Sequence, residues 1–209
     1  GCLNDEAGYA TPGPNRPRRG RFWVPLIGLF SGMRLNEICQ LDVADVQEVD
    51  GVWCFHIRLD PAGEHDKRLK TGASERLIPI HPMLLDIGIL AYASERRSEG
   101  GLKFFPELRR STTGYYSDPF SKWFRRFLKS AGANSPRTCF HSFRHCFRDE
   151  LRRTRADHEL AMRLGGWAGI SAKAEVSASY GSGFSTQQMA HAVAQVRYLP
   201  LSFTHLVKH

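Results

Sequence analysis

Polar and hydrophobic residues alternate in the first half of the chain, which is the pattern of half-buried β-strands. Every second residue from Trp53 to Leu59 is apolar, and the segment Val52 to Leu59 is preceded by a shorter segment, Val46 to Val49, with a valine at each end. The Asp50-Gly51 pair between these two segments is a strong signal for a two-residue hairpin turn. Arg76 to Ile80 adds a third strand. The pattern therefore predicts a small three-stranded antiparallel sheet.

Further along the chain the apolar spacing becomes helical. The clearest helix is Pro119 to Ala131, where aromatic residues share one stripe and basic residues take the opposite face. An earlier apolar run, Phe22 to Phe30, leads into the glycine turn Ser31-Gly32. The predicted helices are Asn36 to Gln40, Met83 to Glu95, Pro119 to Ala131, Ser142 to Arg153, Asp157 to Leu164 with Asp157 as N-cap, and Thr186 to Val196. Together with the sheet they predict an α+β fold that is mainly α-helical.

The composition is that of one globular domain with loose ends. The chain has 209 residues, of which 42% are hydrophobic and 24% charged, which is ordinary for a compact protein. Residues 1–20 are rich in glycine, proline and arginine, so they predict a linker or arm rather than a helix. We expect the main domain over residues 21–183, followed by a C-terminal helix and an apolar-basic tail over residues 184–209.

The charge balance indicates an anionic partner. Lys and Arg number 29 against 21 Asp and Glu, which gives a net charge of +8 and favours nucleic acid first and a membrane surface second. The apolar runs, such as Val24 to Phe30, are too short to span a bilayer, and the first residues carry no secretory signal. Five cysteines without a Cys-x-x-Cys pair indicate free thiols in a reducing compartment. We therefore expect an intracellular protein.

Candidate chemistry gathers first in the segment Phe140 to His145. In a helix His141, Arg144 and His145 stand at positions i, i+3 and i+4 and share one face. A proton-transfer group beside a fixed cation is what phosphate chemistry requires. Two other interpretations stay open: a helix-end cluster near carbonyl groups, or a metal site, for which no acidic or thiol ligand has suitable spacing.

Three further motifs complete the requirements for breaking a phosphodiester without a metal. The reaction needs a nucleophile, cations on the non-bridging oxygens, and an acid for the departing 5′-oxygen. Arg34 lies in Gly32-Met33-Arg34-Leu35-Asn36-Glu37, and its rigid fork could hold phosphate oxygens together with Arg144. Lys70, in a hairpin loop, suits the role of proton donor, and Tyr180 in Ser179-Tyr180-Gly181 suits that of nucleophile.

In this order the motifs resemble the catalytic domain of the tyrosine recombinases, the phage integrase family, over about residues 21–183. The resemblance implies the tyrosine recombinase catalytic-domain fold, and cleavage and rejoining of double-stranded DNA through a 3′-phosphotyrosyl intermediate. Glu37 matches an acidic position of the family that supports the site, and His145 is a second supporting residue. The residues carried over as catalytic are Arg34, Lys70, His141, Arg144, Trp167 and Tyr180.

The resemblance also has consequences for partners and location. It implies no cofactor and no metal, a homotetramer on two DNA sites, and a monomer in the absence of DNA. The protein would then work in the cytoplasm, associated with the nucleoid. The tail Leu199 to Val207 would either dock on a neighbouring protomer or fold back onto its own core.

Two departures from the family pattern keep alternatives open. The chain has Gly166-Trp167 where the family often has Gly-His, and an indole offers an N–H to phosphate but cannot exchange protons. The interval from Trp167 to Tyr180 is also a few residues longer than the family pattern. The rival functions are DNA relaxation of the type IB topoisomerase kind and a DNA-binding module that has lost catalysis.

Overall fold

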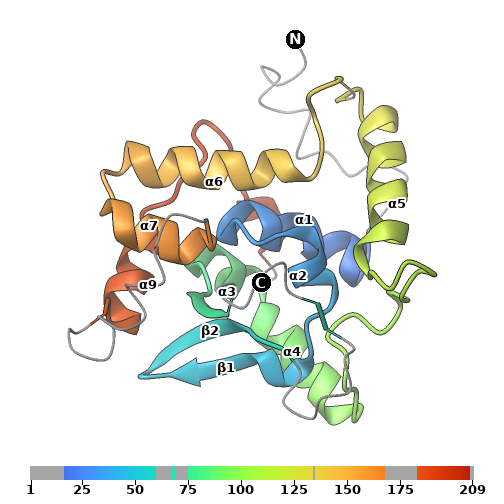
Figure 1. Cartoon of the computed structure of the whole chain (residues 1–209), viewed down its shortest axis with the longest axis horizontal. Helices are drawn as coiled ribbons and strands as arrows, with labels where there is room; N and C mark the ends of the chain where they lie inside the picture. Colours follow the sequence, from blue (N-terminus) through green and yellow to red (C-terminus); the bar gives the residue numbers. More distant parts are fainter. Residues whose placement is uncertain (1–16, 60–66, 69–74, 134, 168–182, 208–209) are drawn as a thin grey trace.

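The computed structural model describes residues 17–59, 67–68, 75–133, 135–167 and 183–207. Helix α1 lies in the middle of the molecule and packs against α6 on one side and α3 on the other (Figure 1). The described helices are α1 (Gly20–Ser31), α2 (Leu35–Cys39), α3 (Pro82–Ile87), α4 (Ile89–Ser98), α5 (Ser117–Ser130), α6 (His141–Arg153), α7 (His158–Gly165) and α9 (Thr186–Ala194), with short 3-10 helices at Val43–Asp45 and Thr204–Leu206.

The predicted three-stranded antiparallel sheet is confirmed. Its strands β1 (Val46–Val49), β2 (Val52–Ile57) and β3 (Arg76–Pro79) lie in the order β1-β2-β3. The hairpin between β1 and β2 turns at Asp50 and Gly51, whose φ angles of 51° and 76° are both positive, as a tight hairpin of this kind requires. Strand β2 ends two residues before the predicted position.

The helix predicted from Met83 to Glu95 is instead two helices, and this expectation is wrong at Gly88. Its φ of 101° is left-handed, so α3 ends there and α4 begins at the next residue. At the other end of α3, the His81 ring caps the helix by accepting a hydrogen bond from the Met83 N–H at 3.0 Å. The helices predicted from Pro119, Ser142 and Asp157 are confirmed within one or two residues.

The described residues form a large core around α1 and a smaller one where α6, α7 and α9 meet. Val24 and Ile27 of α1 are fully buried. Phe147 of α6 is also fully buried, and its ring packs against the turn that follows α1. A Cβ added at Gly32, whose φ is 62°, would lie 2.5 Å from the Phe147 ring. Glycine is therefore required for α6 to approach the end of α1.

The C-terminal residues pack against the chain's own core. The Tyr198 hydroxyl donates a hydrogen bond to the Leu29 carbonyl at 2.6 Å, and the Phe203 ring meets Phe30 edge to face at 5.1 Å. Leu206 and Val207 also pack on the main core. No helix in the described part of the chain is long and apolar enough to cross a bilayer.

Candidate active site

Arg34 lies at the N-cap of α2, and Glu37 in the first turn of the same helix holds it in place. The Glu37 carboxylate accepts a hydrogen bond from the Arg34 backbone N–H at 2.8 Å and another from its Nη1 at 2.7 Å. This pair of bonds from Arg34 to Glu37 follows from the sequence itself, since position N3 of a helix lies beside the N-cap. Glu37 is only 4% exposed, so it acts as an internal support of Arg34.

A second arginine, Arg76, shares the Glu37 carboxylate. Its Nη2 donates to Glu37 Oε2 at 2.9 Å and its Nη1 donates to Oε1 at 3.2 Å. Burial by itself would raise the pKa of Glu37, but the charges and hydrogen bonds of Arg76 and Arg34 outweigh it, so this pKa lies below its ordinary value. Glu37 is therefore an anion held between two guanidinium groups.

Arg144 reaches the same place from the first turns of α6. Its Nη1 donates to the Gly32 carbonyl at 2.6 Å, and its Nη2 donates to the Gly166 carbonyl at 3.5 Å. Arg34 Nη2 donates to the same Gly166 carbonyl at 2.8 Å. Gly32 and Gly166 are the left-handed caps that end α1 and α7, where helix carbonyls carry partial negative charge. Two helix ends thus bring the two guanidinium groups together.

The cluster keeps positive charge that its described surroundings do not compensate. Arg144 is 4% exposed and pairs with no carboxylate in the described residues. Burial and the neighbouring Arg34 charge lower the pKa of Arg144 to about 10. A guanidinium has five N–H donors. Arg34 and Arg144 each make one hydrogen bond from Nη1 and one from Nη2 to described acceptors, so further N–H groups of each remain for another acceptor. An anion at this position would relieve the repulsion and accept those donors.

His141 and His145 form the exposed side of the site. Their rings lie 5.0 Å apart at 80°, one turn from each other on α6. Burial, together with the charges of His145, Arg144 and Arg34, lowers the pKa of His141 below its ordinary value. A neutral His141 can accept a proton at neutral pH. Among the described residues, no group of three or more His, Cys, Asp or Glu side chains could hold a metal ion.

Trp167 contacts Arg144 through its ring face. The Arg144 Cζ lies 4.8 Å from the ring centroid, which is a cation–π distance, and Arg148 lies at 6.0 Å. A Cβ added at Gly165 would lie 2.1 Å from this ring. The indole therefore covers the end of α7 and one face of a guanidinium, while a bond from its N–H to phosphate stays a prediction.

Of the residues predicted from the sequence, the structure brings together Arg34, Glu37, His141, Arg144 and Trp167, with His145 beside His141. Lys70 and Tyr180 lie outside the described residues. Arg76 was missed by sequence reasoning. Its signal was an arginine at the first position of an otherwise apolar strand, which is costly unless the charge is paired.

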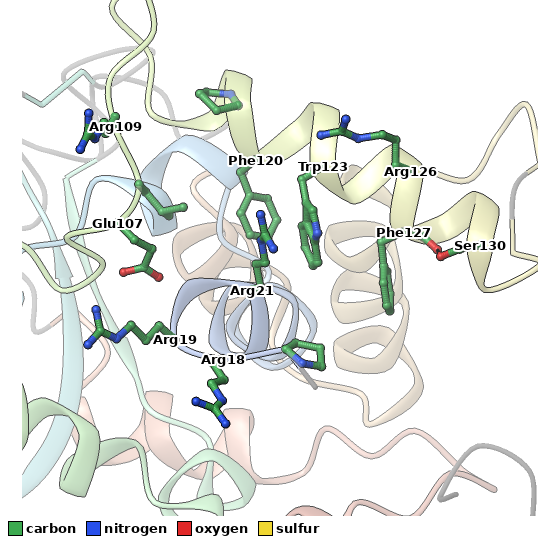
Figure 2. A pocket seen from close by; sticks show the side chains of 13 residues that line it. Arg18, Arg19, Arg21, Glu107, Arg109, Phe120, Trp123, Arg126, Phe127 and Ser130 are labelled. Carbon is green, nitrogen blue, oxygen red and sulfur yellow. Dashed lines mark hydrogen bonds between the residues drawn. The ribbon is translucent and has the colours of Figure 1, made fainter. Parts of the chain in front are cut away.

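A separate basic groove lies between the start of α1 and α5 and encloses about 1030 Å³ (Figure 2). Figure 2 shows aromatic side chains of α5 pointing toward α1, and the Arg21 Cζ lies 5.2 Å from the Trp123 ring centroid. The charged residues that line it are Arg18, Arg19, Arg21, Arg109, Arg126 and one carboxylate, Glu107. The groove shares no residue with the candidate active site and has the charge to hold an anionic polymer.

The model of the Phage integrase family matches residues 24–175. The structure is similar to that of the XerH site-specific recombinase bound to difH substrate in a pre-cleavage complex, with a TM-score of 0.53 and 21% identity over 79% of this chain and 47% of that chain. A post-cleavage complex of XerH with palindromic difH substrate gives a TM-score of 0.47 and 20% identity over 77% and 45% of the two chains. The chain thus spans about half the length of these recombinases, and no curated protein matches it.

Proposed function

The chain belongs to the phage integrase family, and on that premise we propose that it is the catalytic domain of a tyrosine-type site-specific recombinase. Its substrate would be double-stranded DNA, which it cleaves and rejoins. The observation that carries the proposal is the meeting of Arg34 and Arg144 on one carbonyl with unused donors, beside His141. This arrangement fits the two non-bridging oxygens of one phosphodiester.

In the proposed reaction the Tyr180 phenolic oxygen attacks the phosphorus atom. A bond from phosphorus to the tyrosine oxygen forms, and the bond from phosphorus to the 5′-oxygen breaks. The phenolic proton passes to neutral His141, and Lys70 protonates the departing 5′-oxygen. Because one phosphoester replaces another, the energy of the bond is kept, and a 5′-hydroxyl from a partner strand can reverse the step.

The arginines stabilise the charge that develops on the phosphate oxygens. Arg34 and Arg144 are already fixed by Glu37, Gly32 and Gly166, so they need little reorganisation when the reaction begins. Such preorganised donors are worth more in a site that excludes water than in solution. Trp167 would donate a hydrogen bond from its indole N–H, while the face of its ring holds the Arg144 guanidinium in position.

Exchange between two DNA sites requires a partner for each cleaved strand, so we propose four protomers on two sites and a monomer without DNA. The tail that follows Tyr180 would dock on a neighbour in that assembly, although it packs on its own core here. The basic groove would add sequence-independent contacts to the DNA backbone. This activity would take place in the cytoplasm on nucleoid DNA.

The test is covalent trapping on a nicked suicide substrate. The wild-type chain is expected to form a denaturant-stable adduct, and mapping of the modified peptide should place the DNA on Tyr180. Tyr180→Phe should bind DNA as tightly as the wild type and form no adduct. Binding without any adduct in the wild type would favour the inactive DNA-binding module, and relaxation of supercoils without exchange between two sites would favour a topoisomerase.

A further inference from the structure

We propose that Arg76 is a positioning residue of this site, which holds Glu37 and the turn at Gly166 so that Arg34 and Arg144 can grip one phosphate together. The inference rests on the proposed function, because positioning has a meaning only for the reaction that these arginines serve. Arg76 itself is the first residue of β3 and its side chain is 3% exposed, so it contacts Glu37 from within the protein interior.

Arg76 completes the hydrogen bonding of Glu37. The carboxylate receives two bonds at Oε1, from Arg34 Nη1 and Arg76 Nη1, and two at Oε2, from the Arg34 N–H and Arg76 Nη2. A carboxylate has about four acceptor sites, so all of them are in use. With every site occupied, Glu37 cannot rotate without losing a bond, and the Arg34 fork that it holds is fixed in direction.

Arg76 also supports the turn that both catalytic arginines share. Its Nε donates to the Leu164 carbonyl at 3.0 Å in the last turn of α7. A Cβ added at Gly166 would lie 2.9 Å from the Arg76 Cζ, so the guanidinium lies directly against this turn. The Gly166 carbonyl accepts from Arg34 and Arg144, and Trp167 follows it. The Arg76 side chain therefore contacts both Glu37 and the Gly166 turn, which between them position Arg34, Arg144 and Trp167.

Only an arginine can make these contacts at once. Its planar fork sends Nη1 and Nη2 toward Glu37 and Nε toward Leu164, along three fixed directions. A lysine keeps the charge but concentrates it on one atom, which cannot reach a carboxylate and a distant carbonyl in that geometry. Misplacement of a catalytic group by about 1 Å can cost about 100-fold in rate. Arg76→Lys should therefore weaken catalysis more than binding or folding.

The experiment compares Arg76→Lys with the wild type and with Arg58→Lys. Arg58 is the control, because it also pairs with a buried carboxylate, Asp45 at 3.0 Å, next to the same sheet but outside the candidate site, although its own side chain is 25% exposed. At saturating DNA, we expect Arg76→Lys to cut the rate of adduct formation at least about tenfold. Its DNA dissociation constant and thermal midpoint should stay close to those of Arg58→Lys, which should cleave like the wild type.

A pH profile supplies a readout that a merely structural role would not move. Arg76→Gln keeps an amide donor but removes the charge, and the cations of the described residues that then remain near Glu37 are Arg34 from its own helix and Arg144 from α6. Burial would raise the Glu37 pKa in this variant, so the acid limb of the cleavage rate should move to higher pH. Arg58→Gln should leave that limb unchanged.

Three outcomes would overturn the inference. Arg76→Lys could cleave within about twofold of the wild type, or its cleavage, DNA binding and thermal midpoint could fall together, as they would for a residue that only supports the fold. The acid limb of Arg76→Gln could also coincide with that of the wild type. A wild-type chain that forms no adduct would remove the proposed function itself, which these comparisons distinguish from a failure of Arg76 alone.

Discussion

Two clusters of buried charge in this protein differ in how their charges are compensated. The arginine cluster consists of Arg34, Glu37, Arg76 and Arg144, and the aspartate cluster of Asp42, Asp45, Arg58, Lys67 and Lys103. In the aspartate cluster every cation contacts a carboxylate, and Lys67 lies 2.7 Å from Asp42 and also bonds Asp45. In the arginine cluster Arg144 donates hydrogen bonds to carbonyl oxygens and lies against the Trp167 ring, but it pairs with no carboxylate among the described residues.

The comparison shows that burial of a charge is not by itself the mark of a site. Lys67 and Arg144 are 5% and 4% exposed, so exposure does not separate them. Their partners do, because two carboxylates satisfy an ammonium whereas carbonyls leave a guanidinium with its full charge. The aspartate cluster is therefore compensated within itself, whereas the arginine cluster keeps a net positive charge, as the proposed phosphate site requires.

The largest effect is expected at Arg144. Arg144→Lys keeps one positive charge but loses the paired donors, so the rate of adduct formation should fall about 100-fold or more. The measurement is single-turnover cleavage of a suicide substrate at saturating DNA. Arg153→Lys is the control, since Arg153 lies on the same helix, pairs with Glu150 at 2.7 Å and is 53% exposed. Cleavage by Arg144→Lys at the wild-type rate would refute the role of the fork.

In the aspartate cluster, by contrast, a substitution should lower the stability of the fold. Lys67→Met removes the cation shared by two carboxylates and leaves Asp45, which is 1% exposed, without it, so the free energy of unfolding should fall by about 3 kcal/mol. Urea unfolding measures this change. Lys103→Met, at the partly exposed rim of the same cluster, should cost less than about 1 kcal/mol. Equal losses of unfolding free energy in the two variants would contradict the distinction between the buried Lys67 and the partly exposed Lys103.

A smaller effect is expected from His141 as the pH changes. Its pKa in the free protein lies below the ordinary value of 6.5, and a bound phosphate would raise it by adding negative charge. The bound pKa then exceeds the free one, so DNA binding takes up a proton and affinity rises as the pH falls between the two values. For uptake of one proton, the DNA affinity can change by at most about tenfold per pH unit. Measurement of the DNA dissociation constant against pH at constant salt tests this. His141→Asn should flatten the dependence of affinity on pH. A pH dependence equal to that of the wild type would exclude an anion beside His141.

The smallest effect concerns the basic groove, which extends the comparison to exposed charge. Arg126→Gln should lower the slope of log affinity against log salt by about 0.9, the value for one lost phosphate contact. The rate of cleavage at saturating DNA should not change, because Arg126 is outside the candidate site. Arg97→Gln on α4 is the control. A slope equal to that of the wild type would show that DNA does not enter the groove.

Local chemistry predicted much of the fold. The Asp50-Gly51 turn, the Asp157 cap and the amphipathic α5 all follow from residues within one or two turns of each other, and each was confirmed. The break at Gly88 was missed because a glycine inside an apolar run is compatible with a continuous helix until packing selects the left-handed conformation. Strand and helix ends shifted by one or two residues for the same reason.

The order of the motifs along the sequence identified the family by resemblance. Helical spacing was enough to place Arg34 beside Glu37 and to set His141 one turn from Arg144. The sequence could not determine that Arg34 and Arg144 share the carbonyl of Gly166, or that Arg76 fixes Glu37. Those contacts join residues separated by 132, 22 and 39 positions. Only the packing of α1, α2, α6, α7 and β3 sets these distances, and only distance decides whether a buried charge is neutralised or left available for a substrate.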